Sequence, residues 1–287
     1  MDLTSETGRR RALLATAALS TVGFVALYLV AVRTGVGQRV DEIAVLQHRY
    51  DRTSDADATL FLRLAAGVLA VAGVSICWIA RRRPALLLAT AVGVPGAVVF
   101  ANVLRRVVLG RVELTNQGSM HGASFPSGHT SAAVALAIAL VLSSPRRTWR
   151  TFVTALALAG SVGSLVVLIP IHRPSDALAA NLVGLTTMCL AVAVVPGAVV
   201  ALGSTRPALT VGHQNAVLAL GVAGSTAVWL AVSAVALSRA GYSLADVGAG
   251  YPIAVAAVFA LSGAVLGTAG WLASSGSVNP AGPGGPA

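Results

Sequence analysis

Apolar runs of about 20 residues recur along this chain, and they constrain its fold more than any other feature. A helix needs about that length to cross the hydrocarbon core of a bilayer. Only helices and closed barrels satisfy their backbone hydrogen bonds in that environment. Of the 287 residues, 56% are hydrophobic and 10% are charged, whereas a soluble domain carries about 25% charged residues. The sequence therefore predicts an all-α, polytopic membrane protein.

The apolar runs predict eight membrane-spanning helices, at residues 12–32, 60–80, 85–104, 127–142, 151–169, 174–195, 215–237 and 251–273. The first run resembles a signal peptide, but its length and the lack of a small-residue cleavage site favour a retained anchor. The stretch 33–59 between the first two runs is polar and is expected to be a solvated loop.

The spans suggest how the chain divides. A short cytoplasmic N-terminus, 1–11, precedes a six-helix domain over 12–200. Two additional spans follow within 201–273. The tail 274–287 is rich in Gly, Pro and Ser and has little to bury, so it is expected to be disordered.

The net charge of +10 comes from 20 basic residues, all of them arginine, against 10 acidic residues. In a membrane protein this excess suits loops, lipid head groups or an anionic substrate, so we expect no nucleic-acid partner. Three clusters, Arg9–Arg11, Arg81–Arg83 and Arg146–Arg150, fall on one predicted face. The positive-inside tendency assigns that face to the cytoplasm. We therefore expect a protein of the cytoplasmic membrane with both termini inside.

A polar turn precedes the fourth span, at Ser124-Phe125-Pro126-Ser127-Gly128-His129. Ser127 can cap the helix, and Gly128 lets a ligand approach the backbone closely. The first N–H groups of the helix and the helix dipole then favour an anion, with His129 as a possible proton donor. A histidine at a helix start is more often a polar cap, so this turn alone only suggests a site.

A second polar group, His172-Arg173-Pro174-Ser175-Asp176, opens the sixth span. If Pro174 takes the first helical position, Asp176 takes the third and can reach back toward His172. A carboxylate that holds an imidazole fixes its tautomer and makes it a better nucleophile or base. The alternative is a simple helix cap. Because one helical hairpin separates the two groups, His129 and His172 are expected on the same outer face.

Three arginines, Arg105, Arg106 and Arg111, follow the third span on that face. Guanidinium groups suit the oxygens of a phosphate, because they present several N–H donors in a planar fork. The alternative for Arg105 and Arg106 is that they only anchor the end of a helix.

The two histidine groups, at this spacing, resemble the type 2 phosphatidic acid phosphatase/haloperoxidase superfamily, over residues 12–200. The resemblance implies a phosphatase without metal or other cofactor that acts on a membrane lipid at the outer face. His172 would attack phosphorus, oriented by Asp176, and His129 would protonate the leaving oxygen. The phosphate would be held by Ser127, Gly128, Arg105 and Arg111. Possible substrates are prenyl diphosphates, phosphatidylglycerol phosphate and phosphatidic acid.

The chain departs from the family pattern at two basic positions. The first family motif is best matched by Arg105 with Arg111, although five residues separate them instead of six and Val112 replaces a proline. Val166 stands where the third motif has an arginine, and Arg173 or Arg106 could substitute for it. These changes leave an alternative, a catalytically weak relative that binds or transports a phospholipid or lipid-linked sugar. A haloperoxidase is less expected, because those relatives are soluble.

Overall fold

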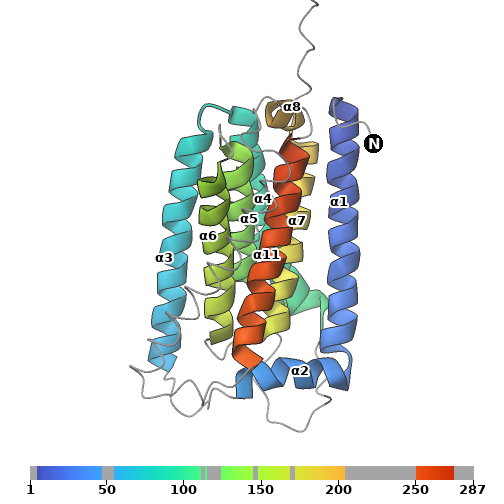
Figure 1. Ribbon diagram of the computed structural model, residues 1–287, viewed down its shortest axis with the longest axis vertical. Coiled ribbons are helices and arrows are strands. Elements are labelled where there is room, and N and C mark those ends of the chain that lie inside the picture. The colour runs from blue at the N-terminus through green and yellow to red at the C-terminus, as the bar shows by residue number, and fades with distance from the viewer. Residues whose placement is uncertain are drawn as a thin grey trace, which may run out of the picture.

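The computed structural model describes residues 5–46, 55–110, 114, 124–144, 148–168, 172–203 and 250–274. Within these residues the secondary structure is helical, without strands, which confirms the all-α expectation. The long helices stand side by side in one upright bundle (Figure 1). Five described helices are long and apolar enough to cross a membrane: Glu6–Val32, Pro84–Val108, Trp149–Val167, Pro174–Val194 and Tyr251–Ala273.

The predicted spans coincide with helices wherever the structure describes them; the span predicted at 215–237 lies outside the described residues. Two of the long helices end in a π-helical turn. The elements of the bundle are α1 (Glu6–Leu27) with η1 (Tyr28–Val32), α3 (Asp55–Ala80), α4 (Pro84–Val103) with η3 (Leu104–Val108), α5 (Gly128–Ser143), α6 (Trp149–Leu168), α7 (Pro174–Val194) and α11 (Gly250–Ser274). A short helix, α8 (Ala198–Gly203), follows α7.

The centre of the bundle is formed by α5 and α7, whose side chains are mostly buried. Their backbones approach closely at Gly184, where an added Cβ atom would lie 2.8 Å from Val134 Cγ1. Small residues at a helix contact permit this kind of close packing in membranes. The last helix, α11, belongs to the same core, because Tyr251 and Phe259 are buried in it and the Phe259 ring covers Gly160 of α6.

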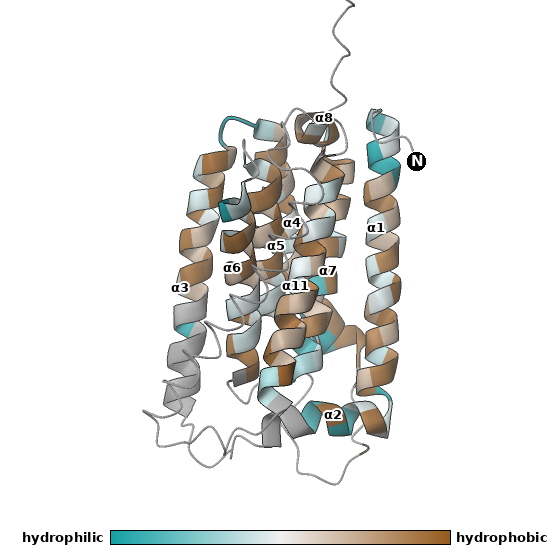
Figure 2. Ribbon diagram, viewed as in Figure 1, coloured by the Kyte–Doolittle hydropathy of each residue, from teal (hydrophilic) through white to brown (hydrophobic). Residues whose placement is uncertain are grey.

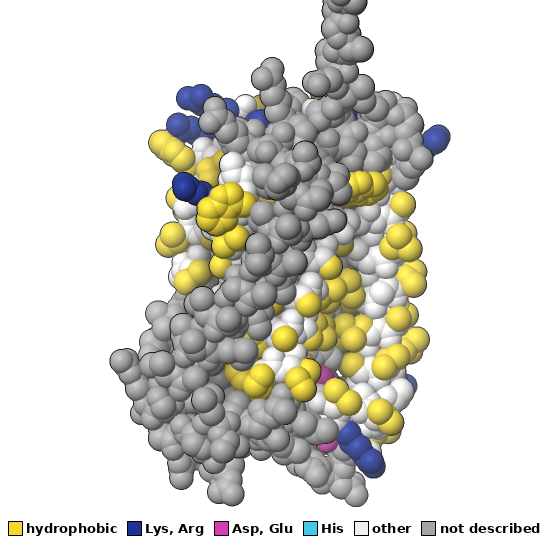
Figure 3. Space-filling view, viewed as in Figure 1, with side chains coloured by type: hydrophobic (Ala, Val, Ile, Leu, Met, Phe, Trp, Pro, Cys, Tyr) yellow, Lys and Arg dark blue, Asp and Glu magenta, His cyan; other side chains and the backbone are white. Residues whose placement is uncertain are grey.

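The outside of the bundle is apolar. Large hydrophobic side chains are exposed along it, among them Leu19, Val22, Val74 and Val99. Figure 2 shows the hydrophobic colouring over the length of the helices, and Figure 3 shows arginines gathered toward the two ends of the bundle. Soluble monomers rarely expose apolar surface on this scale. Together with the long apolar helices, this surface makes the chain a multi-pass membrane protein.

One sequence prediction was wrong. Part of the stretch predicted to be a solvated loop forms helix α2 (Gly35–Leu46), which lies across one end of the bundle (Figure 1). Its polar residues Gln38, Asp41 and Glu42 are buried, while Val36 and Val40 are exposed. Residues three and four apart share one helix face. The polar face of α2 therefore points into the protein, which a reading of polar segments as solvated loops does not anticipate.

Candidate active site

The two histidine motifs meet at the end of the bundle where α5 and α7 begin. Ser127 N–H donates to the backbone carbonyl of Asp176 over 3.1 Å. The Ser124 hydroxyl donates to Asp176 Oδ2 over 2.5 Å. One bond to the main chain and one to the side chain thus join the turn before α5 to the first turn of α7. This is the juxtaposition that the hairpin spacing predicts.

The pair formed by His172 and Asp176 has the predicted geometry. The helix starts at Pro174, which needs no N–H partner at this position, and Asp176 is its third residue. Asp176 Oδ2 lies 3.2 Å from His172 Nδ1 and accepts the Arg173 N–H over 2.9 Å. Both side chains are buried, with Asp176 fully shielded from solvent. The carboxylate therefore caps the helix and holds the imidazole at the same time.

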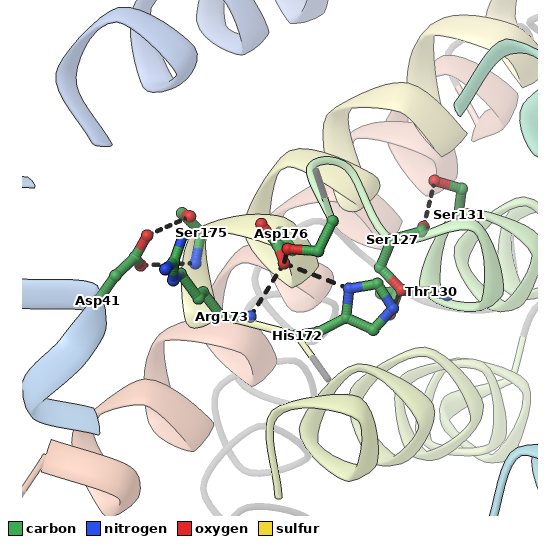
Figure 4. Close-up of polar contacts among 9 residues, drawn as sticks. Asp41, Ser127, Thr130, Ser131, His172, Arg173, Ser175 and Asp176 are labelled. Carbon is green, nitrogen blue, oxygen red and sulfur yellow. Dashed lines mark hydrogen bonds and ion pairs between the residues drawn. The ribbon is translucent and has the colours of Figure 1, made fainter. Parts of the chain in front are cut away.

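This contact determines which ring nitrogen of His172 is available for chemistry. A carboxylate beside Nδ1 favours the proton on that atom, which leaves the lone pair on Nε2. Figure 4 shows the ring with its other nitrogen turned away from Asp176, on the side of Ser127 and Thr130. The basic nitrogen of His172 thus faces the helix start that the sequence predicts as an anion site.

The start of α5 is built around Ser127, which is fully buried. Its Oγ caps the helix by accepting Thr130 N–H over 3.4 Å and the Thr130 hydroxyl over 3.1 Å. The Ser131 hydroxyl donates to the Ser127 carbonyl over 2.9 Å. A Cβ atom added to Gly128 would lie 3.6 Å from Asn102 Nδ2. The end of α4 therefore stands next to this turn.

Arg105 joins the cluster through Asn102. The half-buried Arg105 donates from Nη2 to Asn102 Oδ1 over 2.9 Å, and Asn102 donates in turn to the Val98 carbonyl over 2.8 Å. His129 interacts electrostatically with both His172 and Arg105. The structure therefore brings together both histidines and one of the predicted arginines.

The other predicted arginines differ in their surroundings. Arg106 is exposed next to Arg105, and Arg111 lies outside the described residues. Arg173 is buried, and its Nε has no hydrogen-bond partner among the described residues. Val166, at the position where the family has an arginine, is buried in the apolar core of the bundle.

A buried carboxylate that the sequence analysis did not assign to the site comes from α2. Asp41 Oδ1 accepts Ser175 N–H over 3.1 Å, and Asp41 Oδ2 accepts the Ser175 hydroxyl over 2.6 Å. Burial and the charge of Asp176 raise the pKa of Asp41 to about 7. The signal in the sequence was the helical spacing of Gln38, Asp41 and Glu42, which marks one polar face.

The fold and the site thus define an integral membrane helical bundle with a histidine–carboxylate pair beside a helix N-terminus and an arginine. Residues 59–200 match the model of the PAP2 superfamily, and through this region the chain belongs to that superfamily. Members of the superfamily are generally phosphatases, and this supports the general class of phosphoric ester hydrolase for the chain. No curated protein and no solved structure matches the chain significantly.

Proposed function

We propose that this protein is a metal-independent phosphatase that hydrolyses the phosphate or diphosphate monoester of a membrane lipid through a phosphohistidine. The observation that carries the proposal is the buried contact between Asp176 and His172 Nδ1, joined by hydrogen bonds to the Ser127 turn. A buried carboxylate is costly unless it is hydrogen-bonded. Here Asp176 Oδ2 contacts the Ser124 hydroxyl, His172 Nδ1 and Arg173 N–H. These contacts direct the imidazole toward the start of α5.

In the first step, His172 Nε2 attacks phosphorus. The N–P bond forms while the bond from phosphorus to the lipid oxygen breaks, and that oxygen takes a proton from His129. Arg105, Arg111 and the N–H groups of Gly128 and His129 at the start of α5 stabilise the charge on the equatorial oxygens. Asp176 offsets the positive charge that develops on the His172 ring.

In the second step, water attacks phosphorus and breaks the N–P bond. His129, now neutral, takes a proton from that water as it attacks. Inorganic phosphate leaves, and His172 returns to its starting form. For a diphosphate substrate, the second phosphate requires further cations, a role we assign to Arg106 and Arg173.

A lipid substrate is supported by what surrounds the site. Arg106 stands in η3 beside Val107 and Val108, which are 79% and 61% exposed. A guanidinium next to exposed apolar side chains suits a phosphate head group attached to a hydrocarbon chain. Prenyl diphosphates, phosphatidylglycerol phosphate and phosphatidic acid all have this character.

We also propose that the site faces the exterior of the cytoplasmic membrane. The N-terminus and the turn between α3 and α4 lie at one end of the bundle, and α2 lies at the other (Figure 1). Arg9–Arg11 and Arg81–Arg83 belong to the first end, whereas the site lies beside α2. The positive-inside tendency then makes the first end cytoplasmic.

The test is phosphate release from phosphatidic acid and from a prenyl diphosphate by the purified protein in EDTA. We expect release by the wild type, inhibition by vanadate, and loss of at least about a thousandfold in His172→Ala, because the nucleophile is gone. Equal rates for wild type and His172→Ala would overturn the enzyme proposal.

The burial of Val166 in apolar surroundings favours one alternative, a catalytically weak relative that binds or transports a phospholipid or lipid-linked sugar. This alternative predicts that the protein binds such lipids at equilibrium while releasing no phosphate above the His172→Ala background.

A further inference from the structure

The polar face of α2 reaches the helix start that carries the proposed nucleophile. Both carboxylate oxygens of Asp41 accept hydrogen bonds from Ser175, one from its N–H over 3.1 Å and one from its hydroxyl over 2.6 Å. Ser175 is the second residue of α7 and directly precedes Asp176. Asp41 is only 4% exposed, so the contact is shielded from water.

The first turn of α7 is therefore held from two sides. Asp176 binds inward, to His172 Nδ1 and to the Ser124 hydroxyl. On the other side, Asp41 of α2 binds Ser175. The first N–H groups of a helix have no partner within the helix, and a carboxylate at this end also complements the helix dipole. The Asp41 carboxylate thus supplies from α2 a partner for Ser175 N–H and a second carboxylate at this helix start, beside Asp176.

Charged groups of both signs surround this contact. Arg173 attracts the Asp41 carboxylate, and Asp176 repels it. Glu42 follows Asp41 on α2, and Tyr251 is buried in the first turn of α11, which also packs against α2. Keeping a carboxylate in this setting is costly, because burial disfavours its charged form.

We infer that Asp41 is a positioning residue for the reaction: by holding Ser175, it fixes the first turn of α7 and so the direction of the His172 ring. The inference rests on the proposed phosphatase function. Asp41 does not touch the substrate in this role. It acts through Ser175 on the neighbouring His172–Asp176 pair, for which small displacements matter, since a shift of about 1 Å in a reacting group can cost about a hundredfold in rate.

The competing explanation is that Asp41 only attaches α2 to the bundle. Gln38 provides the matched control, because it is a second buried polar anchor of the same helix. It donates from Nε2 to the Val32 carbonyl over 2.7 Å and accepts Leu114 N–H at Oε1 over 3.0 Å, and neither of these two bonds involves α7. We expect Gln38→Ala to loosen α2 while leaving Ser175 and Asp41 in contact.

The experiment compares kcat and KM for phosphate release in EDTA by wild type, Asp41→Ala, Asp41→Asn and Gln38→Ala, with His172→Ala as the baseline. We expect Asp41→Ala to lower kcat more than tenfold with KM within about twofold of wild type. Asp41→Asn keeps an acceptor for Ser175 N–H and a group that pairs with its hydroxyl, so it should recover most of kcat. Gln38→Ala should keep kcat within about twofold of wild type, whatever it does to thermal stability.

The outcomes separate the two proposals. If wild type does not exceed His172→Ala, the phosphatase function itself fails. If wild type is active but Asp41→Ala retains its kcat, or Gln38→Ala loses as much kcat as Asp41→Ala, the positioning role is overturned. Should Asp41→Ala not fold, Ser175→Ala replaces it. This variant loses the shorter of the two bonds to Asp41 and keeps the N–H bond, so we expect a smaller loss of kcat, and an unchanged kcat in it would overturn the inference.

Discussion

The hydroxyl of Ser124 and the carboxylate of Asp176 meet over 2.5 Å, although 52 residues separate them in the chain. This bond ties the turn before α5 to the residue that orients His172. The positions of both proposed catalytic histidines, one on α5 and one before α7, are therefore linked by a bond between the two helix starts.

The bond between Ser124 and Asp176 can be removed by one substitution. Ser124→Ala removes a donor from a buried carboxylate, and a hydrogen bond to a charged group contributes about 1.5–3 kcal/mol. We expect kcat/KM for phosphate release to fall at least about tenfold. Ser75→Ala is the control, because Ser75 lies on exposed α3 surface and its hydroxyl donates to the Val71 carbonyl of the same helix. Equal kcat/KM in the two variants would show that the Ser124 bond does not serve the site.

Asp176→Asn tests the orientation of the proposed nucleophile. The amide keeps the size of the side chain but no longer favours the His172 tautomer with its lone pair on Nε2. We expect kcat to fall by at least about a thousandfold, as expected when an orienting carboxylate is replaced by an amide. Rapid-quench measurement of the phosphohistidine should show that its formation is the slowed step. Normal phosphohistidine formation with slow hydrolysis would contradict this assignment.

The two arginines of η3 should differ in their effects. Arg105 is held by Asn102 and interacts with His129, whereas Arg106 is exposed. Lysine keeps the charge but loses the planar fork of donors. We expect Arg105→Lys to lower kcat/KM about tenfold or more, and Arg106→Lys to lower it less than threefold, with a monophosphate substrate. A larger loss in Arg106→Lys would mean that phosphate binds nearer the surface than proposed.

The raised pKa of Asp41 should show in the pH dependence of the protein's stability. Its pKa is raised from 3.8 to about 7 in the folded protein, mainly by burial. A raised carboxyl pKa means that the folded state binds the proton more tightly than the unfolded state, so stability falls as pH rises between about 4 and 7. We expect wild type to gain stability relative to Asp41→Asn when the pH is lowered from 8 to 5, by an amount on the order of 1–3 kcal/mol. Parallel profiles of melting temperature against pH for the two proteins would contradict this prediction.

The packing of α11 can be tested with two glycines. An added methyl group at Gly160 would meet the Phe259 ring, whereas nothing lies within 4 Å of the corresponding position at Gly67. We expect Gly160→Ala to destabilise the protein by about 1–3 kcal/mol through overpacking. Gly67→Ala should be neutral or slightly stabilising, because alanine favours the helix. Thermal unfolding in detergent measures the stability of both variants. Similar melting temperatures would show that the Phe259 ring does not lie against Gly160.

The sequence predicted the helices of the bundle because apolar length is a local property that the bilayer requires. It also predicted the contact between His172 and Asp176, since a proline at the first helical position sets where the third residue points. It did not predict α2, because a polar helix face buried against protein has the composition of a solvated loop. Arg111 and the span at 215–237 lie outside the described residues and stay predictions.

By itself, then, the sequence determined the all-α membrane bundle and the pairing of His172 with Asp176, because both follow from spacing within one helix or one hairpin. Only the tertiary structure decided that Asn102, which holds Arg105, lies beside Gly128 and that Asp41 binds Ser175. Asp41 and Ser175 lie 134 residues apart. A contact over that separation depends on how whole helices pack, and no local pattern in the chain specifies it.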